Sequence, residues 1–137
     1  MNIEYTKDIN SITVDMLTGF FVDWPNPPNS ETHLKILSDS YCSYIAIDQD
    51  SRKVVGFVNS ISDGVLTAYI PLLEVLPEYQ VKGIGGELTK LILAELKDIY
   101  MIDICHDEEL ISYYSKFGAH PSFSSIFRNY DAQSDRV

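Results

Sequence analysis

Residues 80–86 read Gln-Val-Lys-Gly-Ile-Gly-Gly and combine a glycine-rich turn with the expected start of a helix. The first amide groups of a helix have no partner within it, and the helix dipole adds positive potential there. Glycines allow positive φ angles and close approach of a ligand. The pattern predicts an anion site, although a tight turn without a ligand fits the same residues. The patterns G-x-x-x-x-G-K-[ST] and G-x-G-x-x-G are absent, which excludes a P-loop and a dinucleotide fingerprint.

A strand and a helix must hold this turn in place. Residues 65–76 are apolar and β-prone, so they predict a long strand that leads into the turn. Residues 86–98 predict a helix with one apolar stripe, formed by Leu88, Leu91, Ile92, Leu96 and Ile99. Pro71 cannot donate a hydrogen bond to a neighbouring strand, so it indicates a bulge or a splay within the predicted strand.

The remaining segments predict an α/β domain around this unit. Three prolines in four positions at residues 25–28 exclude a helix and a central strand there. A strand–helix–strand crossover further along the chain predicts a parallel pair of strands. The other expected elements are an edge strand at 2–7, a helix from Ser11 to 21, a short helix with Ser30 as N-cap, a hairpin of 41–47 and 53–60, a strand at 101–105, a helix from 107 that ends at Gly118, and a last strand at 123–130.

Composition limits the class of protein. At 137 residues with 45% apolar residues, we expect one globular domain over residues 1–137, with a polar tail from about residue 131. The formal net charge of −10 argues against nucleic acid and suits attraction of a cationic small molecule such as an amine, or simply solubility. We expect no membrane span, no signal peptide, no metal site and a cytoplasmic location. Cys42 and Cys105 form no metal pattern, and we interpret them as reduced thiols.

Two motifs resemble the GCN5-related N-acetyltransferase (GNAT) superfamily. The segment Gln80-Val81-Lys82-Gly83-Ile84-Gly85 resembles the family signature [Q/R]-x-x-G-x-[G/A] between a bulged strand and a helix. Tyr114-Ser115-Lys116-Phe117-Gly118 resembles a second family element on a helix near the C-terminus. The resemblance covers about residues 41–123. It implies the GNAT fold: a single mixed, mostly antiparallel sheet that is splayed at the bulged central strand, with helices on both faces.

The resemblance also implies acetyl-CoA, or a related acyl-CoA, as the acyl donor. Its pyrophosphate would lie on the glycine-rich turn, and its pantetheine arm would add to the bulged strand as an extra strand at Leu73, Glu74 and Val75. Lys82 either adds a positive charge or is simply solvated. The implied cofactor-binding residues of the turn are Gln80, Val81, Lys82, Gly83, Ile84, Gly85 and Gly86.

The family reaction is acyl transfer to an amine by direct attack on the thioester. By position, the backbone N–H of Leu73 would stabilise the oxyanion, and Tyr114 matches the general acid that protonates the departing thiolate. From the residues alone, an amphipathic core position on one face with Leu110 and Phe117 is the favoured interpretation of Tyr114, and the resemblance favours the acid role. Asp107 stands where relatives often carry an Asn that contacts the cofactor, and either that contact or a helix start explains it.

The general base departs from the family pattern. Tyr69 and Pro71 occupy the positions where many relatives carry Glu or His, and neither is a base at neutral pH. Strand alternation turns Glu74 away from its neighbours, so a structural or solvated role fits it too. The amine would lose its proton through water or to a base from the N-terminal half.

The acceptor pocket is expected between the first two helices. Trp24 could enclose a substrate or cap the core, and Glu31 could bind a cationic amine or start a helix. His33 and Tyr69 complete the candidate substrate residues. We predict an N-acetyltransferase acting on a primary amine of a small molecule, without a metal. A protein or peptide acceptor, or an acyl-CoA-binding regulatory module with little turnover, stays open, as does a homodimer.

Overall fold

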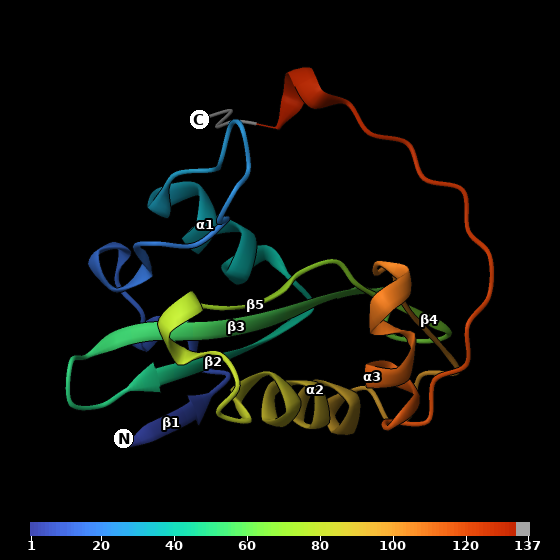
Figure 1. Ribbon diagram of the computed structural model, residues 1–137, viewed down its shortest axis with the longest axis horizontal. Coiled ribbons are helices and arrows are strands. Elements are labelled where there is room, and N and C mark those ends of the chain that lie inside the picture. Colours follow the sequence, from blue (N-terminus) through green and yellow to red (C-terminus); the bar gives the residue numbers. More distant parts are fainter. Residues whose placement is uncertain (134–137) are drawn as a thin grey trace.

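The computed structural model describes residues 1–133 and contains one six-stranded mixed sheet (Figure 1). The strand order is β1-β2-β3-β4-β6, and β5 pairs with β3 in line with β4. All pairs are antiparallel except β4 with β6, which confirms the predicted parallel pair. The strands are β1 (Ile3–Thr6), β2 (Cys42–Asp48), β3 (Lys53–Ser62), β4 (Thr67–Ile70), β5 (Leu73–Val75) and β6 (Met101–Ile104).

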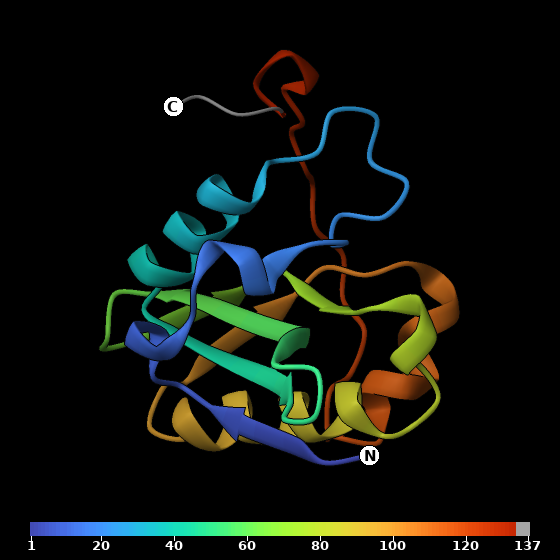
Figure 2. The same ribbon diagram turned by 90° about the vertical axis from the view of Figure 1, so that its left-hand side faces the viewer.

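Helices cover both faces of the sheet, as predicted. Helix α2 (Ile84–Glu95) packs on one face against β2, β3 and β5, and α1 (Ser30–Asp39) lies on the other (Figures 1 and 2). Helix α3 (Ile111–Ser115) lies beside the end of the sheet that carries β4. No helix among residues 1–133 has the length and apolar character needed to cross a membrane.

The predicted apolar stripe anchors α2. Leu88, Ile92 and Leu96 are completely buried against the sheet, at spacings of four residues. Gly56 of β3 permits this close packing, because a Cβ there would lie 3.2 Å from the side chains of both Ile84 and Leu88. The core on the opposite face centres on Phe57 of β3 and aromatic residues that precede α1.

The predicted strand over residues 65–76 is divided into β4 and β5 at Pro71 and Leu72. The break agrees with the bulge or splay expected at Pro71. Before the break the strand pairs with β6, and after it the strand pairs only with β3. The strand therefore separates from β6 after Ile70, at the position where the family pattern places a splay.

Three local predictions were wrong. The helix expected from Ser11 to 21 consists of 3₁₀ turns at Ile9–Ser11 and Val14–Leu17, followed by positive φ angles at Gly19 and Phe21 that no helix accommodates. The helix expected over 107–118 begins as a 3₁₀ turn at Glu108–Leu110 and is α-helical only in α3, which ends at Ser115; the positive φ of +95° at Gly118 follows in the turn after it. The N-cap of α1 is Asn29 rather than Ser30, and its side chain accepts from the amide of Thr32 at 2.8 Å.

The strand expected over residues 123–130 was also wrong. This segment is extended but forms no ladder with any strand of residues 1–133, and it ends in a 3₁₀ turn at Tyr130–Ala132. The polar tail expected from about residue 131 lies outside the described residues beyond residue 133. The edge strand at the N-terminus and the 41–60 hairpin are present as β1, β2 and β3.

Candidate active site

The strand β5 has one free edge, and two of its residues direct their backbone groups toward it. Antiparallel pairing with β3 uses the groups at alternate residues, and the amide of Leu76 donates to the carbonyl of Val55 at 2.9 Å. The backbone groups of Leu73 and Val75 therefore face the opposite edge. No strand within the described chain pairs with β5 there. This edge is the splay between the two halves of the sheet.

An apolar cavity of about 190 Å³ opens beside this edge. It lies between the sheet and the helices α2 and α3, and it brings Leu73 and Tyr114 onto one wall despite their separation in sequence. Its lining residues are Val58, Ile70, Leu73, Thr89, Ile92, Leu93, Ile102, Ile104, Tyr114, Phe117, Gly118 and Ala119. The arrangement can enclose the apolar part of an extended ligand that pairs with β5.

Tyr114 is held between two aromatic rings at this cavity. The ring of His106 stacks on it at a centroid distance of 4.7 Å, and Tyr113 meets it edge-on at 5.0 Å. Burial, assisted by Tyr113, raises the pKa of the Tyr114 hydroxyl above its usual value. A phenol with a raised pKa keeps its proton at neutral pH, so it can act as a proton donor.

The glycine-rich turn forms a cradle of backbone amides. Val81 and Gly83 have φ angles of +62° and +85°, on either side of Lys82. Such alternation turns successive N–H groups toward one point, which is the geometry of an anion-binding nest. Gly83 is the N-cap of α2 and has no side chain to satisfy the helix, so the first amides of α2 are available to a ligand. A Cβ on Gly83 would meet no heavy atom within 4 Å, which indicates open space in front of the turn.

Residues 9–119 match the family model of the Acetyltransferase (GNAT) family. The chain belongs to the GNAT acetyltransferase family. This finding agrees with the fold, since the glycine turn before α2 is one of the two motifs that carried the resemblance, and the splayed mixed sheet is the fold that the resemblance implied.

Known proteins similar to this GNAT chain support the assignment. A candidate acetyltransferase from Deinococcus radiodurans R1 is 39% identical, with a TM-score of 0.92 over 96% of this chain and 91% of that one. The uncharacterized N-acetyltransferases ycf52 of Porphyra purpurea and Gracilaria tenuistipitata var. liui are 27% and 25% identical over 82% and 71% of this chain. The chain spans 66% and 55% of the length of these two relatives.

The structure separates the candidate donor-site residues into two groups. The free edge of β5 and the start of α2 adjoin each other, because a Cβ built on Gly85 would lie 3.7 Å from the side chain of Val75. The candidates at these two places are Leu73, Val75, Val81, Lys82, Gly83, Ile84, Gly85 and Gly86. The side chain of Gln80 lies at the same edge, because its amide nitrogen donates to the carbonyl of Val75 at 2.9 Å. Asp107 is exposed and precedes a 3₁₀ turn without a capping bond from its side chain. The side chain of Ile84 packs in the core, so only its backbone can serve a ligand.

Glu74 has a structural role in this GNAT chain. Its carboxylate accepts the amides of Phe21 and Val22 at 2.9 and 3.3 Å, so it fixes the loop before α1 to the bulged strand. The side chain thus points away from its neighbours, as strand alternation predicts. Glu74 remains in the site only through its backbone.

Two residues near the site were not identified from the sequence. The buried Asn59 of β3 holds the strand break: its side-chain oxygen accepts the amide of Leu72 at 3.1 Å, and its amide nitrogen donates to Ser40 at 3.0 Å. A buried Asn within the apolar run of β3 was the available signal. The hydroxyl of Tyr113 lies 3.5 Å from a Cβ built on Gly85, beside the start of α2.

The candidate acceptor residues are dispersed. Trp24 is 38% exposed and packs edge-on against Phe21, and Glu31 is exposed in the first turn of α1. Tyr69 lies beside Ile61 on the sheet face opposite α2. The pKa of its hydroxyl is raised, mainly by hydrogen bonding with Cys105 and to a smaller extent by burial. His33 is only 1% exposed, so its side chain is in the core rather than in a pocket.

Substitution of Gly83 tests the cradle. We expect CoA to raise the melting temperature of the wild-type protein and to have no effect on Gly83→Glu. Glutamate would add a negative charge at the anion site and strain a position that needs a positive φ. Gly64→Glu is the matched control, because Gly64 has a similar φ of +77° but lies in a different turn. An unchanged shift in Gly83→Glu would exclude this cradle as the CoA site.

The core position of His33 predicts an acid-sensitive fold. Its ring packs against Phe20, Phe21 and Phe57 at centroid distances of 4.4–5.3 Å, and neither ring nitrogen has a hydrogen-bond partner within the described residues. Burial lowers the pKa of His33 from 6.5 to about 4. Because the unfolded chain binds this proton first, stability is complete above pH 6.5 and falls as the pH drops toward 4.

Urea unfolding between pH 7 and pH 4 measures this effect. The shift in pKa corresponds to a loss of about 3 kcal/mol of unfolding free energy across that window. His33→Leu should remove this component of the pH dependence, whereas the same change at the exposed His120 should leave it intact. Equal acid sensitivity of wild type and His33→Leu would contradict the neutral buried imidazole.

Proposed function

We propose that this chain transfers an acetyl group from acetyl-CoA to a primary amine of a small molecule. Membership of the GNAT family supports the reaction class. The observation that carries the proposal is the free edge of β5, which lies beside a cavity shared by Leu73 and Tyr114 and precedes the amide cradle of α2.

The residues present fit an acyl-CoA. Leu73 offers its backbone N–H and C=O and Val75 its N–H to an extended amide-containing arm, in the manner of an added strand, while the carbonyl of Val75 accepts from the side chain of Gln80. The amides around Gly83 offer donors to a pyrophosphate, and the open space before them leaves room for it. When bound, the acetyl-CoA supplies the activated acyl group, and the protein supplies position and hydrogen bonds.

Two groups of the chain would serve the transfer itself. The N–H of Leu73 faces the free edge and would donate to the thioester oxygen as negative charge develops on it. Tyr114 lines the same cavity, and its hydroxyl would protonate the departing sulfur. Both groups belong to ordered elements, which reduces the reorganisation needed at the moment of reaction.

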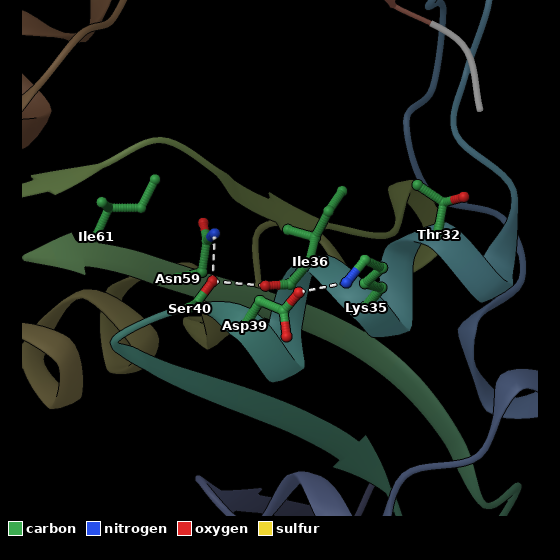
Figure 3. Close-up of a pocket in the computed structure, with 7 residues that line it drawn as sticks. All are labelled: Thr32, Lys35, Ile36, Asp39, Ser40, Asn59 and Ile61. Carbon is green, nitrogen blue, oxygen red and sulfur yellow. Dashed lines mark hydrogen bonds and ion pairs between the residues drawn. The ribbon is translucent and has the colours of Figure 1, made fainter. Parts of the chain in front are cut away.

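A second pocket, of about 390 Å³, suits the acceptor (Figure 3). It lies on the opposite face of the sheet, between α1 and β3, and its lining residues are Thr32, Lys35, Ile36, Asp39, Ser40, Asn59 and Ile61. Asn59 connects this pocket to the strand break, since it bonds both Ser40 and the amide of Leu72. A small amine could therefore approach the acyl group through the break, with Tyr69 beside Ile61 at the rim.

Proton removal from the amine would use water. The carboxylate of Glu74, on the bulged strand, is bonded to two loop amides. In the pocket, Asp39 is paired with Lys35 at 2.6 Å. Because the carboxylates of Glu74 and Asp39 are both already bonded, neither is placed as a free general base. This supports a second candidate function, a module that binds acyl-CoA with little turnover.

Release of free thiol from acetyl-CoA across a panel of amines tests the proposal and separates the two functions. We expect amine-dependent release with small primary amines, and weaker release with peptides that carry a lysine or a free N-terminus. Saturable CoA binding without release for any amine would favour the binding module. Faster release with the peptides would instead assign a protein or peptide acceptor.

A further inference from the structure

The loop of residues 18–24, here called the 18–24 loop, has a backbone conformation that its own residues do not favour. Phe21 and Asp23 have φ angles of +60° and +68°, in the left-handed region that residues with a Cβ rarely adopt. Sparsely populated backbone conformations of this kind persist only where surrounding contacts hold them. The 18–24 loop therefore depends on contacts from the rest of the fold.

Three of these contacts place the loop over the end of β5. The hydroxyl of Ser30 in α1 donates to the carbonyl of Leu17 at 3.2 Å, which fixes the start of the loop. A Cβ built on Gly19 would lie 3.4 Å from the side chain of Leu76, the residue that follows β5. The ring of Phe21 is buried among the aromatic rings of the core.

The carboxylate of Glu74 in β5 supplies the polar part of this support. Its Oε1 accepts the amide of Phe21 at 2.9 Å, and its Oε2 accepts the amide of Val22 at 3.3 Å. Hydrogen bonds to a charged acceptor are shorter and stronger than those between neutral groups. The left-handed Phe21 is therefore held from two sides, by its ring in the core and by its amide on Glu74.

Glu74 also lies close to the proposed reaction centre. It follows Leu73, the proposed oxyanion donor, and pairs with Phe57 of β3. Phe57 and Asn59 are two residues apart and point to the same face of β3, and Asn59 lines the pocket proposed for the acceptor. The 18–24 loop thus covers β5 on the sheet face of the acceptor pocket, and Figure 2 shows the chain before α1 on the same side of the sheet as α1.

The loop ends at Trp24, the single tryptophan of the chain. The indole is partly exposed and meets the ring of Phe21 edge-on at 5.0 Å, and the amide of Trp24 donates to the carbonyl of Phe21 at 3.2 Å. The position of Trp24 therefore follows that of Phe21. A partly exposed indole offers a large apolar surface to a substrate.

We propose that Glu74 is a positioning residue for the amine acceptor. Its carboxylate holds the 18–24 loop over β5 through Phe21, and the loop presents Trp24 as one wall of the acceptor site. The inference rests on the proposed function, because it assumes an amine that reaches Leu73 from this face. The acyl donor would meet β5 through backbone groups, so its binding should not need the side chain of Glu74.

The fluorescence of Trp24 tests this support directly, because the chain has no other tryptophan. In Glu74→Ala, acrylamide should quench Trp24 more strongly than in the wild-type protein, and the amides of Phe21 and Val22 should exchange faster. Glu4→Ala is the matched control, since it removes an exposed carboxylate from β1 of the same sheet. Unchanged quenching in Glu74→Ala would overturn the proposal, whether or not the amides exchange faster.

Steady-state thiol release separates positioning from stability. Glu74→Ala should raise the KM for the best amine by about tenfold, as expected for one lost hydrogen bond to a charged group, and leave the KM for acetyl-CoA unchanged. Glu74→Gln keeps one oxygen for the amide of Phe21, so it should recover part of the affinity for the amine. An unchanged KM for the amine, or equal increases in both KM values, would contradict the positioning role.

Failure of the proposed function would give a different result. If the wild-type protein releases no thiol with any amine, the transfer reaction is wrong, and the acceptor site is tested by binding instead. The amines of the panel are then added to the CoA-bound protein while the emission of Trp24 is recorded. A saturable change that weakens in Glu74→Ala would support the positioning role, and no change with any amine would overturn it.

Discussion

Tyr114→Phe is expected to lower kcat by about 10²–10⁴-fold, which is the usual contribution of a general acid. Phenylalanine keeps the ring that packs between His106 and Tyr113, and it removes only the hydroxyl at the cavity. Binding of acetyl-CoA relies on the backbone of β5 and α2 in our proposal, so the KM for acetyl-CoA should change little. The measurement is steady-state release of thiol with the best amine of the panel.

A matched control separates the hydroxyl from general effects of losing a tyrosine. Tyr100 is 84% exposed and lies outside the cavity, so Tyr100→Phe should retain wild-type kinetics. The melting temperature of Tyr114→Phe should stay near that of wild type, because the substitution creates no cavity. Unchanged kcat in Tyr114→Phe would reassign Tyr114 to packing and leave protonation of the sulfur to water.

The donor side of the site was predictable because local rules determine it. The apolar stripe of α2 has helical period, and Leu88, Ile92 and Leu96 are buried as that period requires. Pro71 cannot complete a ladder, and the strand breaks there. The glycine turn takes positive φ at Gly83, where only a residue without a Cβ is unstrained.

The acceptor side was not predictable, because its geometry depends on contacts between distant segments. The carboxylate of Glu74 bonds the amide of Phe21, which lies 53 positions earlier in the chain, and no local pattern reveals that partner. His33 lies in the segment expected to shape the acceptor pocket, yet tertiary packing places it among three Phe rings. The pocket proposed for the acceptor is therefore lined by residues of α1 and β3 that no sequence pattern marked.

The segment of residues 123–130 shows a different limit. Its β-prone residues predicted a strand, and the prediction failed because a strand needs a pairing partner as well as propensity. Within residues 1–133 the segment has no such partner.

Asn59→Leu is expected to lower the unfolding free energy by about 2 kcal/mol and to slow acyl transfer. Leucine has a similar volume, but it leaves the amide of Leu72 without its acceptor at a partly buried position. The freed bulge would also let Leu73 move, and its N–H is the proposed donor to the thioester oxygen. Urea unfolding measures the first effect, with a lower midpoint at an unchanged m-value, and thiol release measures the second.

Ser40→Ala separates the two bonds that Asn59 makes. It removes the partner of the Asn59 amide nitrogen and the bond from Ser40 to Ile36, but it preserves the bond to Leu72. We therefore expect a loss of stability of about 1 kcal/mol with nearly normal kcat. If both variants lose stability but only Asn59→Leu loses kcat, the side chain of Asn59 positions the oxyanion donor through the bulge. Equal kcat in both would show that the bulge keeps its geometry without Asn59, and that the free edge of β5 alone determines where Leu73 points.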